Sequence, residues 1–180
     1  ICAQPVSLGQ SFLPLLFEHA GFPPDEIGPI LSLRAVGATF AALMLARVIG
    51  SGRGPILAAL GACTIGLGLI VTAQVEGPQV VIVAMSFIGV AAGLLLLFYQ
   101  LLVTELSHGG NRGTALAIAG SGWSLSHLSA PFIVGSIAES VGLEQAFVYW
   151  GGFLVLLGLL MVPFNSWSRL PAQDDAVATG

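Results

Sequence analysis

The sequence of 180 residues is 56% hydrophobic and only 8% charged, and it contains no lysine. A soluble domain carries about a quarter charged residues, so this composition indicates a membrane protein rather than a soluble enzyme or binding domain. The formal net charge is −4, and no cluster of basic residues is present that would bind nucleic acid.

Six apolar segments succeed one another, each long enough to cross about 30 Å of hydrocarbon. They are residues 1–20, 27–49, 55–74, 79–105, 113–140 and 145–165. Turn-forming stretches such as GFPPDE, GSGRGP and SHGGNRG separate them. Residues 166–180 are much less apolar, and we expect a disordered cytoplasmic tail there. The sequence therefore predicts an all-α polytopic membrane protein with six transmembrane helices.

The charges indicate an orientation. If the first segment runs outward, the inner loops and the tail contain Arg47, Arg53, Arg112 and Arg169, whereas the outer loops contain acids and no arginine. Short loops rich in arginine face the cytoplasm. We therefore expect an integral protein of the cytoplasmic (inner) membrane with both ends of this stretch inside. Because the chain opens on Ile1 and its first methionine is Met44, we also expect further sequence upstream.

Polar side chains are concentrated in segments one, two, four and five. Arg34 lies one or two turns inside the outer end of the second segment, and Gly89 and Gly93 form a GxxxG pair in the fourth. The first segment carries a polar face at helical spacing, and the fourth adds an aromatic and an amide; these residues are Gln4, Ser7, Gln10, Ser11, Glu18, Tyr99 and Gln100. The third and sixth segments have almost no polar side chain. This period of three predicts two three-helix repeats in which the third helix faces lipid.

The fifth segment carries His127 near its middle. At about 100° per residue, Ser124, His127, Pro131 and Gly135 share one stripe of this helix, and Trp123 lies beside it. An ionisable ring is costly in hydrocarbon, so the stripe should face a neighbouring helix or a wet cavity.

With these features the chain resembles the C-terminal half, helices seven to twelve, of a major facilitator superfamily (MFS) transporter. The turn LARVIGSGRGP is similar to the family's cytoplasmic signature, with Arg47, Gly50 and Arg53 in place but no acid where the family has one. The run of about forty residues from Arg112 to Gly152 resembles the region of the family's eleventh helix. The resemblance implies an N-terminal six-helix half of the same chain and a central cavity that segments one, two, four and five line. It also implies alternating access for a small organic solute, and we expect proton-coupled efflux.

Three groups of residues are candidates for that function. Those predicted to line the solute path are Gln4, Ser7, Gln10, Ser11, Arg34, Tyr99, Gln100, Trp123, Ser124 and His127. Glu18, Arg34 and His127 are candidates for proton coupling or a charge pair, since Glu18 and Arg34 lie on consecutive antiparallel segments. Arg47, Gly50, Arg53 and Arg112 are candidates for a gating role in the cytoplasmic loops. For each group a structural role, either packing or setting topology, remains open.

Other classes of function fit less well. Ser121 and His127 would lie about 240° apart on a helix, so they cannot form a catalytic dyad, and no HExxH metal motif occurs. We expect no enzyme, no metal site and no cofactor. Cys2 and Cys63 are interpreted as small apolar side chains. The alternative function is a half-size or structural membrane subunit that oligomerises through small-residue helix faces.

Overall fold

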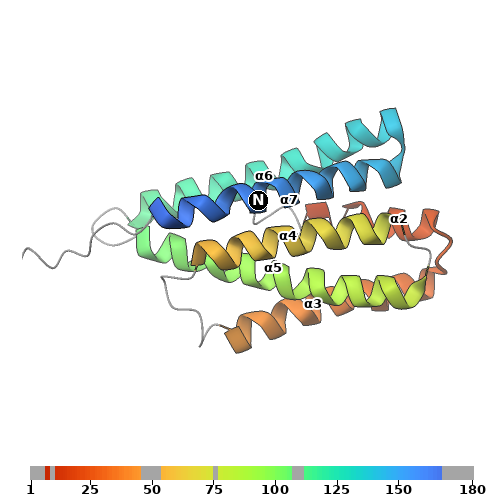
Figure 1. Cartoon of the computed structure of the whole chain (residues 1–180), viewed down its shortest axis with the longest axis horizontal. Helices are drawn as coiled ribbons and strands as arrows, with labels where there is room; N and C mark the ends of the chain where they lie inside the picture. Colours follow the sequence, from red (N-terminus) through yellow and green to blue (C-terminus); the bar gives the residue numbers. More distant parts are fainter. Residues whose placement is uncertain (1–6, 9–10, 46–53, 75–76, 107–111, 168–180) are drawn as a thin grey trace, which may run out of the picture.

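The computed structural model describes residues 7–8, 11–45, 54–74, 77–106 and 112–167. These residues form six helices: α2 (Leu13–His19), α3 (Pro24–Leu45), α4 (Gly54–Gln74), α5 (Pro78–Leu106), α6 (Arg112–Val141) and α7 (Leu143–Trp167). Ser7, Leu8 and Ser11, ahead of α2, are also helical. Successive long helices run in opposite directions along one axis, as an up-and-down membrane bundle requires (Figure 1). The all-α class predicted from the sequence is confirmed.

The helices begin and end close to the limits of the apolar segments. One difference is at α3, which begins at Pro24 rather than at residue 27. Proline is favoured at the first helical position, and Asp25 and Glu26 in the first turn interact favourably with the positive end of the helix dipole. Residues 1–6 and 9–10 of the first segment, and residues 168–180 of the predicted tail, lie outside the described residues.

The turn between α2 and α3 is fixed by a glycine. Gly21 has φ +81°, a left-handed conformation that favours glycine. The N–H of Gly21 donates to the carbonyl of Glu18, and the N–H of Phe22 donates to that of Phe17, at 2.9 Å in the second case. The rings of Phe17 and Phe22 pack with centroids 5.6 Å apart. This pattern of hydrogen bonds with its apolar contact is a Schellman motif, and it reverses the chain within three residues.

Helices α4 and α7 pack through glycines. A Cβ on Gly151 would lie 2.5 Å from the carbonyl oxygen of Gly66, and a Cβ on Gly66 would clash with the carbonyl oxygen of Gly151. Further along, Gly158 lies against Ala59 and Cys63, and the Cys63 Sγ contacts the carbonyl of Val155 at 3.6 Å. This packing differs from the prediction that the third helix of each repeat faces lipid, because 56% of the span Ile56–Gln74 of α4 is buried, more than of the other three spans described as able to cross a membrane.

The predicted GxxxG pair packs within this chain. A Cβ on Gly89 would lie 2.8 Å from the Cα of Arg34, and one on Gly93 would lie 2.9 Å from the Cβ of Ala41. Gly37 of α3 lies equally close to the backbone of α5. Small residues on both helices therefore let α3 and α5 approach closely, as in other membrane bundles.

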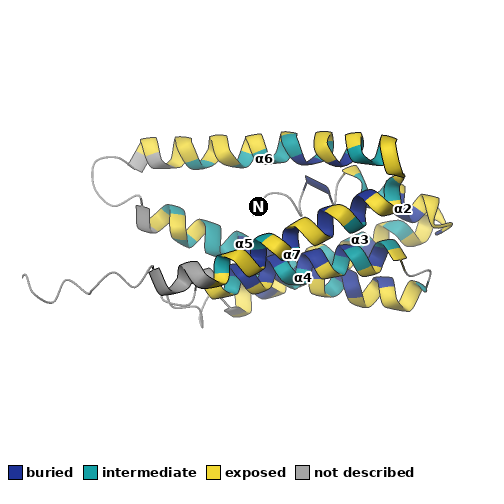
Figure 2. Ribbon diagram, turned by 45° about the horizontal axis from the view of Figure 1, so that its top comes forward, coloured by how far each residue is buried: buried dark blue, intermediate teal, exposed yellow. Residues whose placement is uncertain are grey.

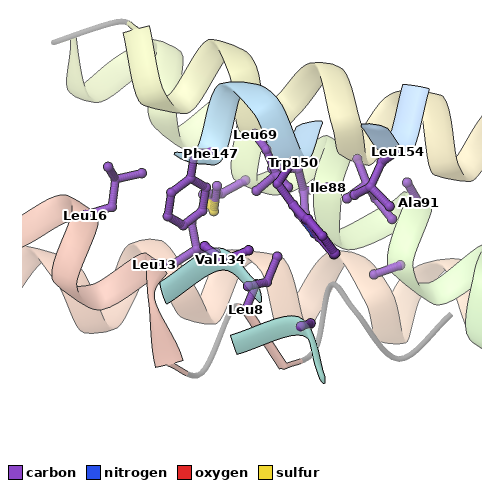
Figure 3. Packing of buried hydrophobic residues seen from close by; sticks show 14 of the residues in the cluster. Leu8, Leu13, Leu16, Leu69, Ile88, Ala91, Val134, Phe147, Trp150 and Leu154 are labelled. Atoms are coloured by element: carbon purple, nitrogen blue, oxygen red, sulfur yellow. The ribbon is translucent and has the colours of Figure 1, made fainter. Parts of the chain in front are cut away.

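Helix α6 lies at the edge of the bundle, where it packs mainly on α7 and less extensively on α5 (Figure 2). Ala130 and Val134, on one face of α6, are completely buried, whereas most of its other side chains are exposed. Val134 of α6 and Phe147 of α7 point toward Leu13 ahead of the α2–α3 turn, and Trp150 reaches toward Leu8 (Figure 3). An apolar core therefore lies where the first segment, α6 and α7 meet.

Four described helices are long and apolar enough to cross a membrane: Pro24–Met44, Ile56–Gln74, Pro78–Thr104 and Leu143–Val162. Helix α6 is long enough but less apolar, because its sequence is rich in glycine and serine. The turns at Gly21 and Gly142 lie at one end of the bundle, with Asp25, Glu26 and Glu144 beside them, and we call this the acidic end (Figure 1). The helix ends that flank residues 46–53 and 107–111 lie at the other end, which we call the arginine end.

Candidate functional site

A hydrogen bond links the first segment to the middle of α6. Pro131 lies inside α6 and has no N–H, so the carbonyl of His127, four residues earlier, lacks its helical partner. The hydroxyl of Ser7 donates to that carbonyl at 2.8 Å. Ser7 is only 2% exposed, so water does not compete for the bond. Two of the predicted path residues, Ser7 and His127, are therefore linked because a proline inside α6 leaves this carbonyl free.

The ring of His127 belongs to a stack of aromatic side chains. It lies parallel to the ring of Trp123, one turn earlier on α6, with centroids 6.0 Å apart and an interplanar angle of 21°. Trp123 in turn packs on Tyr99 of α5 with centroids 5.2 Å apart. All three side chains are half-buried. We call Tyr99, Trp123 and His127 the aromatic stack; it links α5 to α6 through the contact of Tyr99 with Trp123.

The Nδ1 atom of His127 is buried and has no hydrogen-bond partner in the described part of the chain. A buried polar nitrogen without a partner costs free energy that packing alone does not return. His127 lies about 22 Å from the start of α6, at the midpoint of that helix. The ring thus presents an unsatisfied nitrogen at mid-span, which makes His127 a candidate site residue.

Arg34 lies on the face of α3 that packs against α5, where the Gly89 backbone contacts it. The sequence places Arg34 one or two turns inside the helix, but α3 begins at Pro24, so it lies about 15 Å from that end. Its side chain is half-buried. The backbone of Arg34 therefore lies at the middle of α3 (Pro24–Leu45).

The structure does not bring Glu18 and Arg34 together. Glu18 is exposed at the acidic end of α2, and no ion pair joins it to Arg34 among the described residues. The difference follows from the earlier start of α3, which moves Arg34 toward the middle of its helix while Glu18 stays one residue from the end of its own.

The remaining candidates divide into exposed residues and residues that the structure does not describe. Ser11, in the helical residues ahead of α2, is exposed, and so are Gln100 on α5 and Ser124 on α6. Arg112 is the first residue of α6. The candidates outside the described residues are Gln4, Gln10, Arg47, Gly50 and Arg53.

Two hollows were not predicted. One, of about 540 Å³, opens at the acidic end between α2, α4 and α7, and its polar lining residues are His19, Thr72, Gln74, Glu144 and Gln145. The other, of about 410 Å³, is apolar and lies between α6 and α7 beside Tyr149, Trp150 and Phe153. The sequence did not predict the first hollow, because it is formed where three turns meet and the sequence does not show which turns lie together.

Comparison with known proteins supplies the family. The family model described as Major Facilitator Superfamily matches residues 6–175, nearly the whole chain. The chain belongs to the major facilitator superfamily. No curated protein matches the sequence.

Membership of this family gives the general function of the chain. The chain is an integral membrane protein of a family of transporters, which act on small solutes within a lipid bilayer. At the level of the family this is a non-enzymatic function. The aromatic stack and Arg34, whose residues the sequence predicts to line the path, are the candidate solute site of this MFS bundle.

Proposed function

We propose that this chain is the C-terminal six-helix half of an MFS secondary transporter that moves a small organic solute by alternating access. The observation that carries the proposal is the chain of contacts from Ser7 through His127 and Trp123 to Tyr99. It joins three of the four helices predicted to line the path, near the middle of the bundle. Transporters of this class bind their solutes close to the bilayer midplane.

The missing partner of this bundle is an N-terminal six-helix half of the same chain. Large apolar side chains on one side of α3 and on α6 are exposed; they include Val36, Phe40, Leu125, Leu128 and Phe132. On α3 and α6, which flank the path, such a face has to be covered by lipid or by another bundle. The small-residue faces of α3, α4, α5 and α7 already pack within this chain, so they support the transporter better than a subunit that oligomerises through them.

Proton coupling and efflux complete the proposal. His127 is the candidate proton carrier, because its ring can bind a proton and its Nδ1 lies at mid-span without a partner in the described residues. The protein resides in the cytoplasmic membrane, with the arginine end of the bundle inside, as the positive-inside rule requires. Arg47, Arg53 and Arg112, in and beside the loops of that end, are candidates for gating.

The test of alternating access uses cysteine labelling of the complete transporter in vesicles. Cys2 and Cys63 are first replaced by serine. Ser124→Cys, on the exposed path face of α6, should then react with a membrane-impermeant thiol reagent from either side of the membrane. Leu156→Cys is the matched control, because Leu156 is 54% exposed near the middle of α7 and should stay unreactive in the apolar part of the membrane. A Ser124→Cys variant that reacts from neither side would overturn the proposal.

The test of coupling measures solute efflux from the same vesicles with and without a pH gradient. A gradient should accelerate efflux by the wild type and should have no effect on His127→Gln. Equal fluxes of the wild type in both conditions would refute proton coupling and leave alternating access in place.

A further inference from the structure

The hollow of about 540 Å³ at the acidic end is separate from the candidate solute site. It lies where α2 and α4 end and α7 begins, and none of its described lining residues is among the predicted path residues (Figure 1). Its volume is typical of small-molecule sites, which range from about 300 to 1,000 Å³. Most of its described lining residues are polar. The hollow is therefore large and polar enough to hold a small organic ligand other than the transported solute.

The charges around the hollow favour a cation. Glu144 lines it, and no arginine is among its described lining residues. The described arginines lie elsewhere, with Arg34 about 15 Å inside α3 and Arg112 at the arginine end, and the sequence contains no lysine. Other exposed carboxylates belong to the same end of the bundle: Glu18, Asp25, Glu26 and Glu139. A cleft in such a field concentrates cations from the surrounding water.

The end of α4 adds to this preference. Thr72, Ala73 and Gln74 are the last three residues of α4, and all three line the hollow. The last carbonyls of a helix carry the negative end of its dipole, which stabilises a nearby cation. The hydroxyl of Thr72 already donates to the carbonyl of Gly68 at 2.7 Å, so what it offers a ligand is an acceptor.

The lining groups fit an ammonium group better than a metal ion. Calcium takes about six to eight oxygen ligands, and the described residues contain no group of three or more His, Cys, Asp or Glu that could hold a metal. An –NH₃⁺ group has three N–H donors, and Glu144, Gln74 and Gln145 each offer it an oxygen. His19, the one basic residue of the described lining, offers a ring nitrogen as a further acceptor in its neutral form.

The lining also distinguishes among ammonium groups. A trimethylammonium group has no N–H to donate and is held by aromatic faces, but no Trp, Tyr or Phe is among the described lining residues. The acceptors of the hollow are matched only by a group that carries N–H donors. A primary ammonium group therefore fits this lining better than a quaternary one.

We propose that the hollow at the acidic end binds a primary ammonium group. Its N–H groups donate to the carboxylate of Glu144 and to the amide oxygens of Gln74 and Gln145, and its methylene groups pack on Leu16 and Val148. Because the hollow opens at an end of the bundle, where membrane meets water, the group belongs either to a free amine or to the headgroup of an ethanolamine lipid.

The first experiment measures the binding of three probes of similar size by saturation-transfer NMR. It uses the complete transporter in phosphatidylcholine nanodiscs, in which no lipid carries a primary ammonium group, and empty nanodiscs as the blank. Ethanolamine carries –NH₃⁺, choline carries a trimethylammonium group, and ethylene glycol is neutral. Ethanolamine should bind at least about tenfold more tightly than either of the other two, because only its N–H donors are charged.

Variants then assign the preference to the hollow. Glu144→Gln should weaken ethanolamine about tenfold or more and leave ethylene glycol unchanged, while Gln74→Leu should weaken ethanolamine about two- to tenfold through the loss of a neutral acceptor. Glu139→Gln is the matched control, because it removes the same charge from an exposed position of α6 outside the lining. It should change the affinity for ethanolamine less than about threefold, since solvent and salt screen exposed charges.

The second experiment identifies the source of the ammonium group. Nanodiscs contain phosphatidylethanolamine and phosphatidylcholine in equal amounts, and native mass spectrometry measures which lipid the protein retains. Preferential retention of phosphatidylethanolamine that Glu144→Gln abolishes assigns the lipid headgroup, whereas equal retention together with tight ethanolamine binding assigns a free amine.

Three results would overturn the ammonium site. They are binding of choline or ethylene glycol as tight as that of ethanolamine, absence of selective binding for both ethanolamine and phosphatidylethanolamine, and equal effects of Glu144→Gln and Glu139→Gln. None of them bears on the solute path, which the labelling of Ser124→Cys tests independently.

Discussion

The hydrogen bond from Ser7 to the carbonyl of His127 permits a prediction about stability. In Ser7→Ala, the carbonyl of His127 loses its donor, and Pro131 offers no N–H to replace it. A buried acceptor without a donor costs about 1–3 kcal/mol, and hydrogen bonds between membrane helices average about 0.6 and reach about 1.7 kcal/mol. Ser7 is 2% exposed, so the upper part of the membrane range applies, and we expect a loss of about 1–2 kcal/mol.

A second substitution tests the reason for that loss. Pro131→Ala restores the N–H four residues after His127, so the carbonyl regains a partner within α6. In the Pro131→Ala background, Ser7→Ala should lower the free energy of unfolding by less than about 0.5 kcal/mol, which is the error within which the effects of independent substitutions add. The two substitutions are therefore expected to couple by about 1 kcal/mol.

The assay is reversible unfolding of the complete protein in mixed micelles, titrated with SDS and followed by tryptophan fluorescence. Ser136→Ala is the control, because the Ser136 hydroxyl bonds to the Phe132 carbonyl of its own helix at 2.9 Å and is exposed. It should change the free energy of unfolding by less than about 0.5 kcal/mol. If Ser7→Ala lowers the free energy of unfolding equally in the wild type and in the Pro131→Ala background, the effect of Ser7 does not depend on the carbonyl that the proline leaves unbonded.

Other contacts predict three further outcomes. Gly151→Ala should lower the free energy of unfolding by about 1–3 kcal/mol in the same assay, because its Cβ would clash with the Gly66 carbonyl. The control is the neighbouring Gly152→Ala, which should be neutral or stabilise the protein by up to about 1 kcal/mol. Equal effects of the two substitutions would contradict the packing of α4 on α7. Native Cys63, packed against Val155 and Gly158, should react with maleimide at least about tenfold more slowly than unfolded protein does, and equal rates would place it in an open environment. Glu18→Gln should not change the effect of Arg34→Gln on the free energy of unfolding by more than about 0.5 kcal/mol. The reason is that no ion pair joins Glu18 to Arg34 among the described residues, and a larger coupling would indicate such a pair.

The sequence predicted the helices well, because a membrane leaves few alternatives. A segment of about 20 apolar residues has to satisfy its backbone internally, so length and hydropathy give element type and order. The turns at Gly21 and Gly142, which adopt positive φ, were readable as glycines between segments. What the sequence did not provide is which helices meet. Gly66 and Gly151 are visible as glycines, but only the packing of α4 on α7 makes them a pair.

The candidate site was predicted in part for the same reason. His127 and Trp123 are one turn apart, so their proximity follows from helical geometry. The contact of Trp123 with Tyr99, by contrast, depends on the register of α5 against α6. Pro131 did contain a local signal, since any proline inside a helix frees the carbonyl four residues earlier. The residue that satisfies this carbonyl, Ser7, is fixed by tertiary structure alone.

The hydrogen bonds also separate structural polar groups from those that need another explanation. The hydroxyls of Ser32, Thr39, Thr72 and Ser86 donate to carbonyls of their own helices, so they are satisfied without any solute. The Nδ1 atom of His127 has no such partner in the described residues. A membrane protein keeps a costly polar group at mid-span when that group has a function. Among the many polar residues of this bundle, the aromatic stack around His127 is therefore where solute specificity should be sought first, and the self-satisfied serines and threonines are expected to tolerate alanine.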